Sequence, residues 1–223
     1  MVFNHDDSLK FPQLKQHNSS LGRVYIVESG QFKGEVYPSI TRVLAAAPKP
    51  GLDAWKKRVG KVEAARVSQR ATTQGGNVHH LVECYLNNQE LPTFGPNVAE
   101  LWGYLKPWLD ANITTVYAQE QNVLSRKLKV AGRADILAMV LTRRAVVDIK
   151  TSAREKTIDW IEDYLLQTTF YSLATYESTG VPFKHIVIPI VNPNGLQVFE
   201  VSPADYYGKL AKRIDEFYEK NSP

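Results

Sequence analysis

The sequence predicts an α/β domain in which a central mixed β-sheet is flanked by helices. Apolar residues recur at helical spacing between residues 39 and 111, alternate in strand-like runs between 115 and 149, and then return to helical spacing. A chain of 223 residues, 43% apolar and 22% charged, is long enough for one well-filled domain. The sequence contains no repeat, low-complexity tract or linker, so we expect a single domain.

The first half of the chain predicts a hairpin followed by helices. Residues 1–22 contain acidic side chains and lack an apolar core, so we expect a mobile start that is neither a secretory signal nor a transit peptide. The runs RVYIVE (23–28) and EVYP (35–38) flank a glycine-containing turn and predict a small β-hairpin. Ser39 or Thr41 is placed to cap the next helix, which ends at the PKPG segment. We expect the helices of this half over residues 39–47, 52–71, 77–88 and 97–111.

The second half combines strands with two more helices. Because side chains alternate faces along a strand, Asp148 and Lys150 share one face of the run VVDIK, and Val147 and Ile149 share the other. An acid and an amine on one strand face indicate a surface, an ion pair or a site. We expect strands over residues 115–125, 127–131, 133–141, 145–149, 185–191 and 196–201. We expect helices over residues 158–179 and 203–220.

Positive charge is concentrated in one segment. The chain has a net charge of +4, yet residues 38–70 alone carry +6. Only Asp53 and Glu63 oppose the basic residues of this segment, which are Arg42, Lys49, Lys56, Lys57, Arg58, Lys61, Arg66 and Arg70. A basic segment on a near-neutral body predicts a polyanionic partner such as nucleic acid, although a solvated helix with a lysine-rich face fits the same charges.

The composition excludes several classes of site. A single cysteine, Cys84, leaves no internal disulfide and no cysteine-held zinc or iron–sulfur cluster, and is typical of a reducing cytosol. No apolar run approaches the ~20 residues of a membrane span, so we expect no membrane partner.

Charged residues inside strand patterns form the first candidate site. Asp135 lies in GRADILAMV, and Asp148 follows across the tight LTRRA connection. A hairpin of that length brings the two carboxylates to one sheet edge, where a proton or a cation relieves their repulsion. With Lys150 beside them, the set suits Mg²⁺ or Mn²⁺. A surface ion pair between Asp148 and Lys150 is the alternative, but the apolar neighbours favour burial. Glu120, in AQEQNVLS, is a further acid in a strand pattern and a structural or supporting partner.

Polar residues four apart on two predicted helices add to this set. His79 and Glu83 share a helix face, so His79 is a candidate imidazole ligand and Glu83 a further ligand or a supporting acceptor. His80 competes with His79 for this role. Gln167 and Tyr171 share a face of a later helix. Each residue taken alone also fits a core histidine or a polar helix margin, so both interpretations stay open.

The order of these motifs resembles that of a known superfamily. GGNVH-x₃-E, the acidic strand residue, GRAD, VVDIKTS and Q-x₃-Y lie between residues 74 and 171. They are similar in order and type to the motifs of the RecB-type branch of the PD-(D/E)xK nucleases. The segment YPSITRVLAAAPKPGLDAWKKRVG (37–60) resembles the front segment of the mitochondrial genome maintenance exonuclease family and its phage-encoded relatives. Gly76 stands where the motif usually carries threonine, and residues 97–111 match no motif.

The resemblance implies a restriction-endonuclease-like core, a central mixed sheet flanked by helices, preceded by a helical DNA-binding segment. It places a single nuclease domain at residues 23–223. Within this domain it assigns residues 37–72 to the basic DNA-binding segment, 74–201 to the core and 203–220 to the closing helix.

The resemblance also implies a metal centre. It makes His79, Asp135 and Asp148 ligands of one or two Mg²⁺ or Mn²⁺ ions, completed by the backbone carbonyl of Ile149. Lys150 then lies beside the attacking water. The residues that support these ligands are Glu83, Glu120, Gln167 and Tyr171.

The implied activity is that of a metal-dependent deoxyribonuclease acting as an exonuclease on single-stranded DNA or frayed ends. The expected DNA contacts are Ser39, Thr41, Arg42, Trp55, Lys57, Arg58, Arg70, Thr151 and Ser152, although Trp55 fits a core position equally well. We expect a cytoplasmic monomer, in the host cytoplasm if phage-encoded, that serves DNA replication, recombination or repair and meets the proteins of these processes. The alternatives are an endonuclease or flap nuclease of the same fold, an inactive nucleic-acid-binding module, and a phosphatase acting on small molecules.

Overall fold

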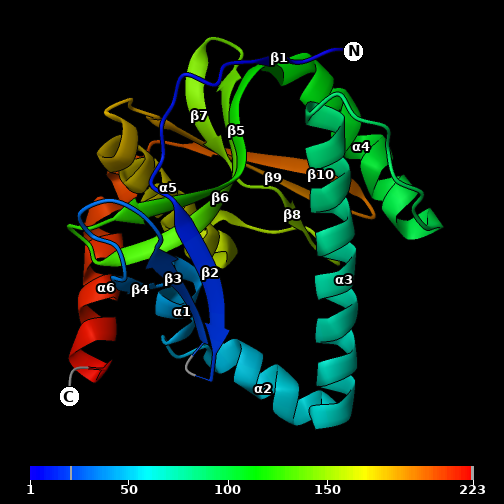
Figure 1. The fold of residues 1–223 in the computed structure, drawn as a ribbon. Helices are drawn as coiled ribbons and strands as arrows, with labels where there is room; N and C mark the ends of the chain where they lie inside the picture. Colours follow the sequence, from blue (N-terminus) through cyan, green and yellow to red (C-terminus); the bar gives the residue numbers. More distant parts are fainter. Residues whose placement is uncertain (21, 222–223) are drawn as a thin grey trace.

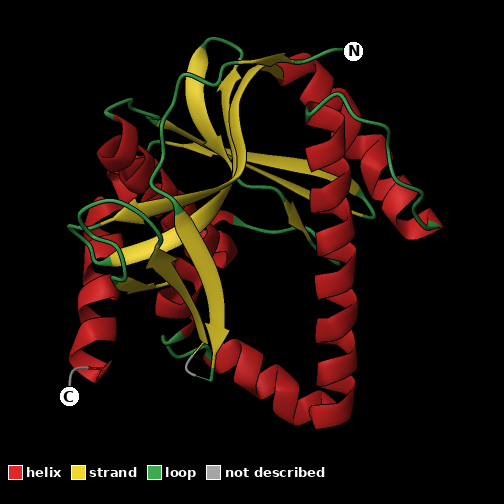
Figure 2. Ribbon diagram, in the orientation of Figure 1, coloured by secondary structure: helices red, strands yellow, loops and turns green. Residues whose placement is uncertain are grey.

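A seven-stranded mixed sheet forms the centre of the computed structural model, which describes residues 1–20 and 22–221 (Figures 1 and 2). Its strands are β1 (Asn4–His5), β5 (Ile113–Ser125), β6 (Val130–Val140), β7 (Arg143–Val147), β8 (Lys150–Thr151), β9 (His185–Asn192) and β10 (Gly195–Val201). The order is β1-β5-β6-β7-β9-β10, with β8 paired to β9. β5, β6 and β7 are antiparallel neighbours, whereas β7 and β9 are parallel. The expected α/β class with a central mixed sheet is confirmed.

A second, antiparallel sheet of three strands lies beside the first. It consists of β2 (Leu14–Ser19), β3 (Gly22–Val27) and β4 (Val36–Pro38), so the predicted hairpin is confirmed. The expectation of a start without fixed structure over residues 1–22 needs correction. β1 pairs with β5 and β2 pairs with β3, because Phe3 and Leu14 find buried places in the core. Residue 21 of that range lies outside the described part.

Helices cover both faces of the larger sheet. α3 (Lys61–Leu86) and α4 (Pro96–Asn112) pack on one face, in the same core cluster as Val147. α1 (Ile40–Ala45), α5 (Glu162–Thr179) and α6 (Tyr207–Asn221) pack on the other face, in the cluster that contains Val146. Short 3₁₀ turns, Ile158–Ile161 and Pro203–Tyr206, precede α5 and α6. No helix in the described part of the chain is long and apolar enough to cross a membrane.

The helix boundary within the basic segment differs from the prediction. The chain breaks at Gly60, between α2 (Pro50–Val59) and α3, and α3 continues without interruption through Gly75 and Gly76. Gly60 has a φ of 84°, a conformation that glycine adopts without steric cost. Glycine inside a helix costs about 1 kcal/mol relative to alanine, but packing of the buried C-terminal half of α3 overrides this preference.

Two strand boundaries also differ. The strands expected over 127–131 and 133–141 form one strand, β6, which passes through Gly132. The strand expected over 145–149 ends at Val147, and a separate short strand begins at Lys150. Both pieces pair with β9, and Asp148 N–H still donates to the carbonyl oxygen of Val187 at 3.0 Å. The interruption at Asp148 and Ile149 is where the candidate site lies.

Candidate active site

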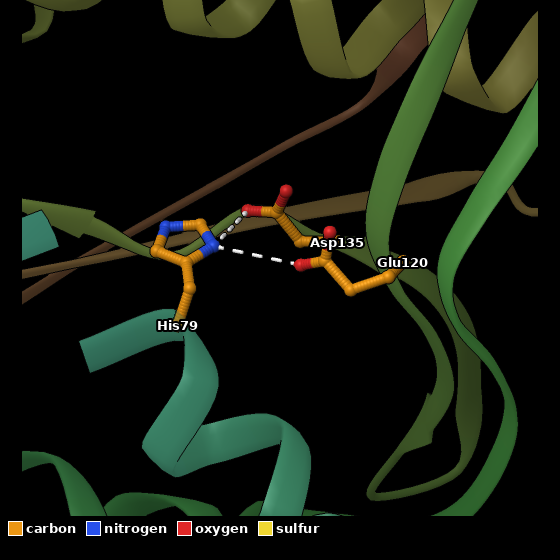
Figure 3. A group of neighbouring side chains, drawn as sticks. All are labelled: His79, Glu120 and Asp135. Carbon is orange, nitrogen blue, oxygen red and sulfur yellow. Dashed lines mark ion pairs between the residues drawn. The ribbon is translucent and has the colours of Figure 1, made fainter. Parts of the chain in front are cut away.

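Three segments far apart in the sequence bring a histidine and two carboxylates together. His79 lies on α3, Glu120 on β5 and Asp135 on β6 (Figure 3). His79 Nδ1 is 3.6 Å from Asp135 Oδ2 and 3.8 Å from Glu120 Oε1. One potential ligand atom from each residue lies within 4.8 Å of the other two. This geometry defines a candidate metal centre.

The interrupted strand completes the cluster. The backbone N–H of Ile149 donates to Asp135 Oδ2 at 3.2 Å, and its carbonyl oxygen accepts from His79 Nε2 at 2.8 Å. The Lys150 ammonium lies 2.5 Å from Asp148 Oδ2, and Gln167 donates to Asp148 Oδ1 at 3.2 Å. Asp148 is fully buried, so Lys150 compensates its charge. The expected Asp148–Lys150 pair is therefore internal, not on the surface.

Burial and mutual repulsion perturb the titration of the cluster. Burial, together with the neighbouring Asp148, raises the pKa of Asp135 to about 7. Burial lowers the pKa of His79, but Asp135 and Glu120 outweigh it, so the pKa stays above its usual value. Burial likewise opposes the charge of Lys150, but Asp148 and Asp135 raise its pKa. Excess negative charge in a buried place is the condition that a bound cation relieves.

The donor set fits a divalent cation. With Nε2 of His79 donating to a carbonyl oxygen, the neutral ring presents the lone pair of Nδ1 to the two carboxylates. Metal-binding histidines usually donate their second ring nitrogen in this way. An imidazole with carboxylate oxygens suits Mn²⁺, and the oxygen atoms suit Mg²⁺.

The structure distributes the predicted ligands differently from the expectation. Glu120, expected as a supporting residue, faces His79 directly beside Asp135. Asp148 is engaged by Lys150 and Gln167, and the Ile149 carbonyl oxygen is engaged by His79. The ligand roles of Asp148 and Ile149 stay predictions.

The predicted supporting residues separate into two groups. Gln167 joins Asp148 to Tyr171, because its amide also lies 3.0 Å from the buried Tyr171 hydroxyl. Glu83 instead lies next to His80, with Oε2 3.6 Å from Nδ1. His80 is more than half exposed, so the structure favours His79 over His80 as the metal-facing histidine.

A cleft of about 530 Å³ opens onto this cluster and is lined by α1, α3, α5 and the two sheets. Of the predicted DNA contacts, Ser39 and Thr41 line it. Ser39 is buried and its hydroxyl caps α1 by accepting from Arg42 N–H at 3.1 Å, which leaves Thr41 as the exposed hydroxyl. The Arg42 guanidinium lies over the Phe217 ring at 5.6 Å.

The other predicted contacts lie outside this cleft. Arg70, Thr151 and Ser152 line a separate cavity of about 420 Å³ between α3 and the segment after β8. Trp55, Lys57 and Arg58 lie on α2, which buries none of its residues, so Trp55 is not a core residue.

Sequence reasoning missed two arginines at the cleft. Arg133 lies 2.8 Å from Glu120 Oε2 through its Nε atom and holds that carboxylate beside His79. Its place inside the GRAD motif was an available signal. Arg23 lines the same cleft from β3, next to Tyr25. Side chains alternate along RVYIV, so Arg23 and Tyr25 share one strand face, and both line the cleft.

The fold and site together define a mixed α/β protein with a central mixed sheet flanked by helices and a candidate metal centre. The chain is 30% identical over 201 residues to mitochondrial genome maintenance exonuclease 1 from Mus musculus. This match covers 82% of the chain but 59% of the mouse protein. It supports a relationship to a nuclease.

Two further comparisons accompany this match. A solved structure titled "Crystal structure of SSO0001" aligns with a TM-score of 0.45 and 16% identity, covering 83% of this chain and 76% of that one. No protein-family model matches the chain.

Proposed function

We propose that this chain is a Mg²⁺- or Mn²⁺-dependent deoxyribonuclease of the restriction-endonuclease-like, PD-(D/E)xK type. One observation carries the proposal: His79, Glu120 and Asp135 come from distant segments and meet at one cleft, and a partly buried lysine pairs with Asp148 beside them. The name of the mouse relative supports it. We propose residues 23–223 as one nuclease domain, to which β1 and β2 of the preceding segment add strands, with residues 74–201 as its core and 37–72 as its DNA-binding segment.

His79, Glu120 and Asp135 would hold the metal ion, with Asp148 as a further proposed ligand. A bound Mg²⁺ or Mn²⁺ supplies an activated water and neutralises charge on the scissile phosphate. Lys150 is held cationic by Asp148 and Asp135, so its ammonium orients the water or balances charge on the phosphate.

A single strand with a free end is the substrate that suits the surroundings of the cleft. α1 and α3 both line it, and α2 joins them across the bottom of the molecule (Figure 1). α1, α2 and the first ten residues of α3 belong to the segment that carries a net charge of +6 over residues 38–70, whereas the part of α3 that lines the cleft follows this segment. We infer that a strand held beside these basic helices enters by an end, which favours exonuclease action. Cytoplasmic location, monomeric state and replication or recombination partners stay predictions.

The test is a time course on an end-labelled single-stranded DNA, run beside a closed circle of the same length, with Mg²⁺, Mn²⁺ or EDTA. We expect metal-dependent decay of the linear strand while the circle stays intact. Lys150→Ala should lose at least about 10²-fold in rate, the scale of a positioned proton-transfer or charge-balancing group. Lys209→Ala is the matched control, because Lys209 forms an exposed ion pair with Glu162.

Any other result of this cleavage assay would indicate a different function. Cutting of the circle identifies an endonuclease, and binding without cutting identifies an inactive binding module. Hydrolysis of a small phosphate ester that is insensitive to salt would identify a phosphatase, since nucleic-acid binding weakens steeply with salt.

A further inference from the structure

A third cavity, of about 930 Å³, lies between α2 and the segment that follows β8. Trp55 and Arg58 line it from α2, and Arg154, Lys156 and Trp160 line it from the segment. We call it the two-tryptophan cavity. It shares no lining residue with the cleft at His79.

The aromatic side of this cavity is exposed. Trp160 is 56% accessible, although tryptophan is highly buried on average. The Arg154 guanidinium carbon lies 4.8 Å from the Trp160 ring centroid and the Lys156 ammonium 6.0 Å from it. An exposed indole among cations offers a stacking surface next to positive charge, which is the combination that binds single-stranded nucleic acid.

Both walls of the cavity are fixed to the body of the protein. Lys49, which precedes α2, forms a 2.7 Å ion pair with Asp163 on α5. The backbone of Lys156 makes two hydrogen bonds with the Gln197 side chain on β10, of 2.8 and 3.1 Å. The cavity is therefore preformed, which lowers the entropic cost of binding.

The chain connects this cavity directly to the catalytic cluster. Lys150 and Arg154 are four residues apart, a span of at most ~14 Å in extended chain. At ~3.4 Å per stacked nucleotide, about four nucleotides cover that distance.

We propose that the two-tryptophan cavity binds unpaired bases and phosphates of the same DNA strand that is cut at the cleft, a few nucleotides from the scissile bond. This inference rests on the proposed function and adds a second contact site for the single-stranded DNA. The indole of Trp160, together with Trp55, stacks on bases, and Arg58, Arg154 and Lys156 contact phosphates.

The test compares Trp160→Ala, Trp160→Phe and the control Tyr176→Ala. Tyr176 is also 56% exposed but lies on α5 and does not line the cavity. Fluorescence anisotropy in EDTA measures binding of oligothymidylates of 4–20 nucleotides and of an abasic strand with the same number of phosphates. We expect Trp160→Ala to weaken oligothymidylate binding about 5- to 150-fold, with the abasic strand unaffected. Trp160→Phe and Tyr176→Ala should bind like the wild type.

Equal oligothymidylate binding by Trp160→Ala and the wild type would overturn the proposal, as would an equal loss on the abasic strand. Photocrosslinking of a strand containing 5-iodouracil gives a second measurement that needs no variant. Crosslinks in the peptides that carry Trp55 or Trp160 support the cavity, and crosslinks confined to other peptides refute it. Metal-dependent cutting by the wild type is scored separately, so a failed cavity and a failed nuclease are distinguishable.

Discussion

Replacing Gly132 by alanine tests whether the sheet and the candidate active site are packed as one unit. A β-carbon at Gly132 would lie 2.7 Å from Tyr171 Cε1, 3.1 Å from Ile40 Cγ2 and 3.3 Å from Phe170 Cε1. All three neighbours are buried, so none moves freely. Overpacking of this kind costs about 1–3 kcal/mol. For a chain of this length that lowers the Tm by about 2–12 °C.

The same substitution should reduce activity, because it displaces Tyr171. The Gln167 amide donates hydrogen bonds to both the Tyr171 hydroxyl and Asp148. Displacing a residue that orients a metal site typically costs about 10- to 100-fold. Calorimetry and the linear-strand assay measure the two effects. Gly103→Ala on α4 is the control, since among the described residues no atom outside its chain neighbours and the backbone of its own helix lies within 4 Å of the added β-carbon, and it should gain about 0.8–1 kcal/mol. An unchanged Tm for Gly132→Ala would refute the packing argument.

Three stability predictions concern an ion pair, a helix cap and a carboxylate that accepts hydrogen bonds, and they are measured by urea unfolding followed by circular dichroism. Lys150→Met leaves the buried Asp148 without its ion-pair partner and should cost about 3–5 kcal/mol, against less than about 1 kcal/mol for Lys209→Met; similar losses would contradict the internal pair. Ser39→Ala removes the N-cap of α1 and should cost about 0.5–2 kcal/mol, and a neutral result would show that the cap is not used. Glu177→Ala removes a carboxylate that accepts three hydrogen bonds and should cost about 1.5–3 kcal/mol, whereas a neutral result would mean that water replaces it.

The fold class and most elements were predictable because the periods of the apolar residues are clear. The boundaries that failed are those where tertiary packing overrides local preference. Gly75 and Gly76 predicted a helix break, but the buried residues that follow hold α3 intact across them. The start of the chain has too few apolar residues to predict order, and it gains its strands by pairing with edges supplied by distant segments.

The sequence predicted which residues form the candidate site better than it predicted which of them contact one another. Motif order identified His79, Asp135 and Lys150, and the structure brings them to one cluster. Residue spacing cannot reveal that Glu120 faces His79. The Glu120 backbone has a φ of 47°, so the regular alternation of side chains along a strand does not apply at this residue. Residue spacing also cannot reveal that Asp148 forms an ion pair with Lys150, because this contact depends on β7 ending at Val147.

Gly75 and Gly76 of α3 line the cleft at positions where the packing of the protein would also accept a larger side chain. An added β-carbon at Gly75 would make an ordinary 3.5 Å contact with Thr151 Oγ1. At Gly76 it would meet no atom of the described residues within 4 Å, apart from its chain neighbours and the backbone of α3 itself. Internal packing therefore requires neither glycine, although each costs the helix about 1 kcal/mol. Both line the cleft one turn before His79. Thr72, four residues before Gly76 and also lining the cleft, is the hydroxyl that α3 offers there.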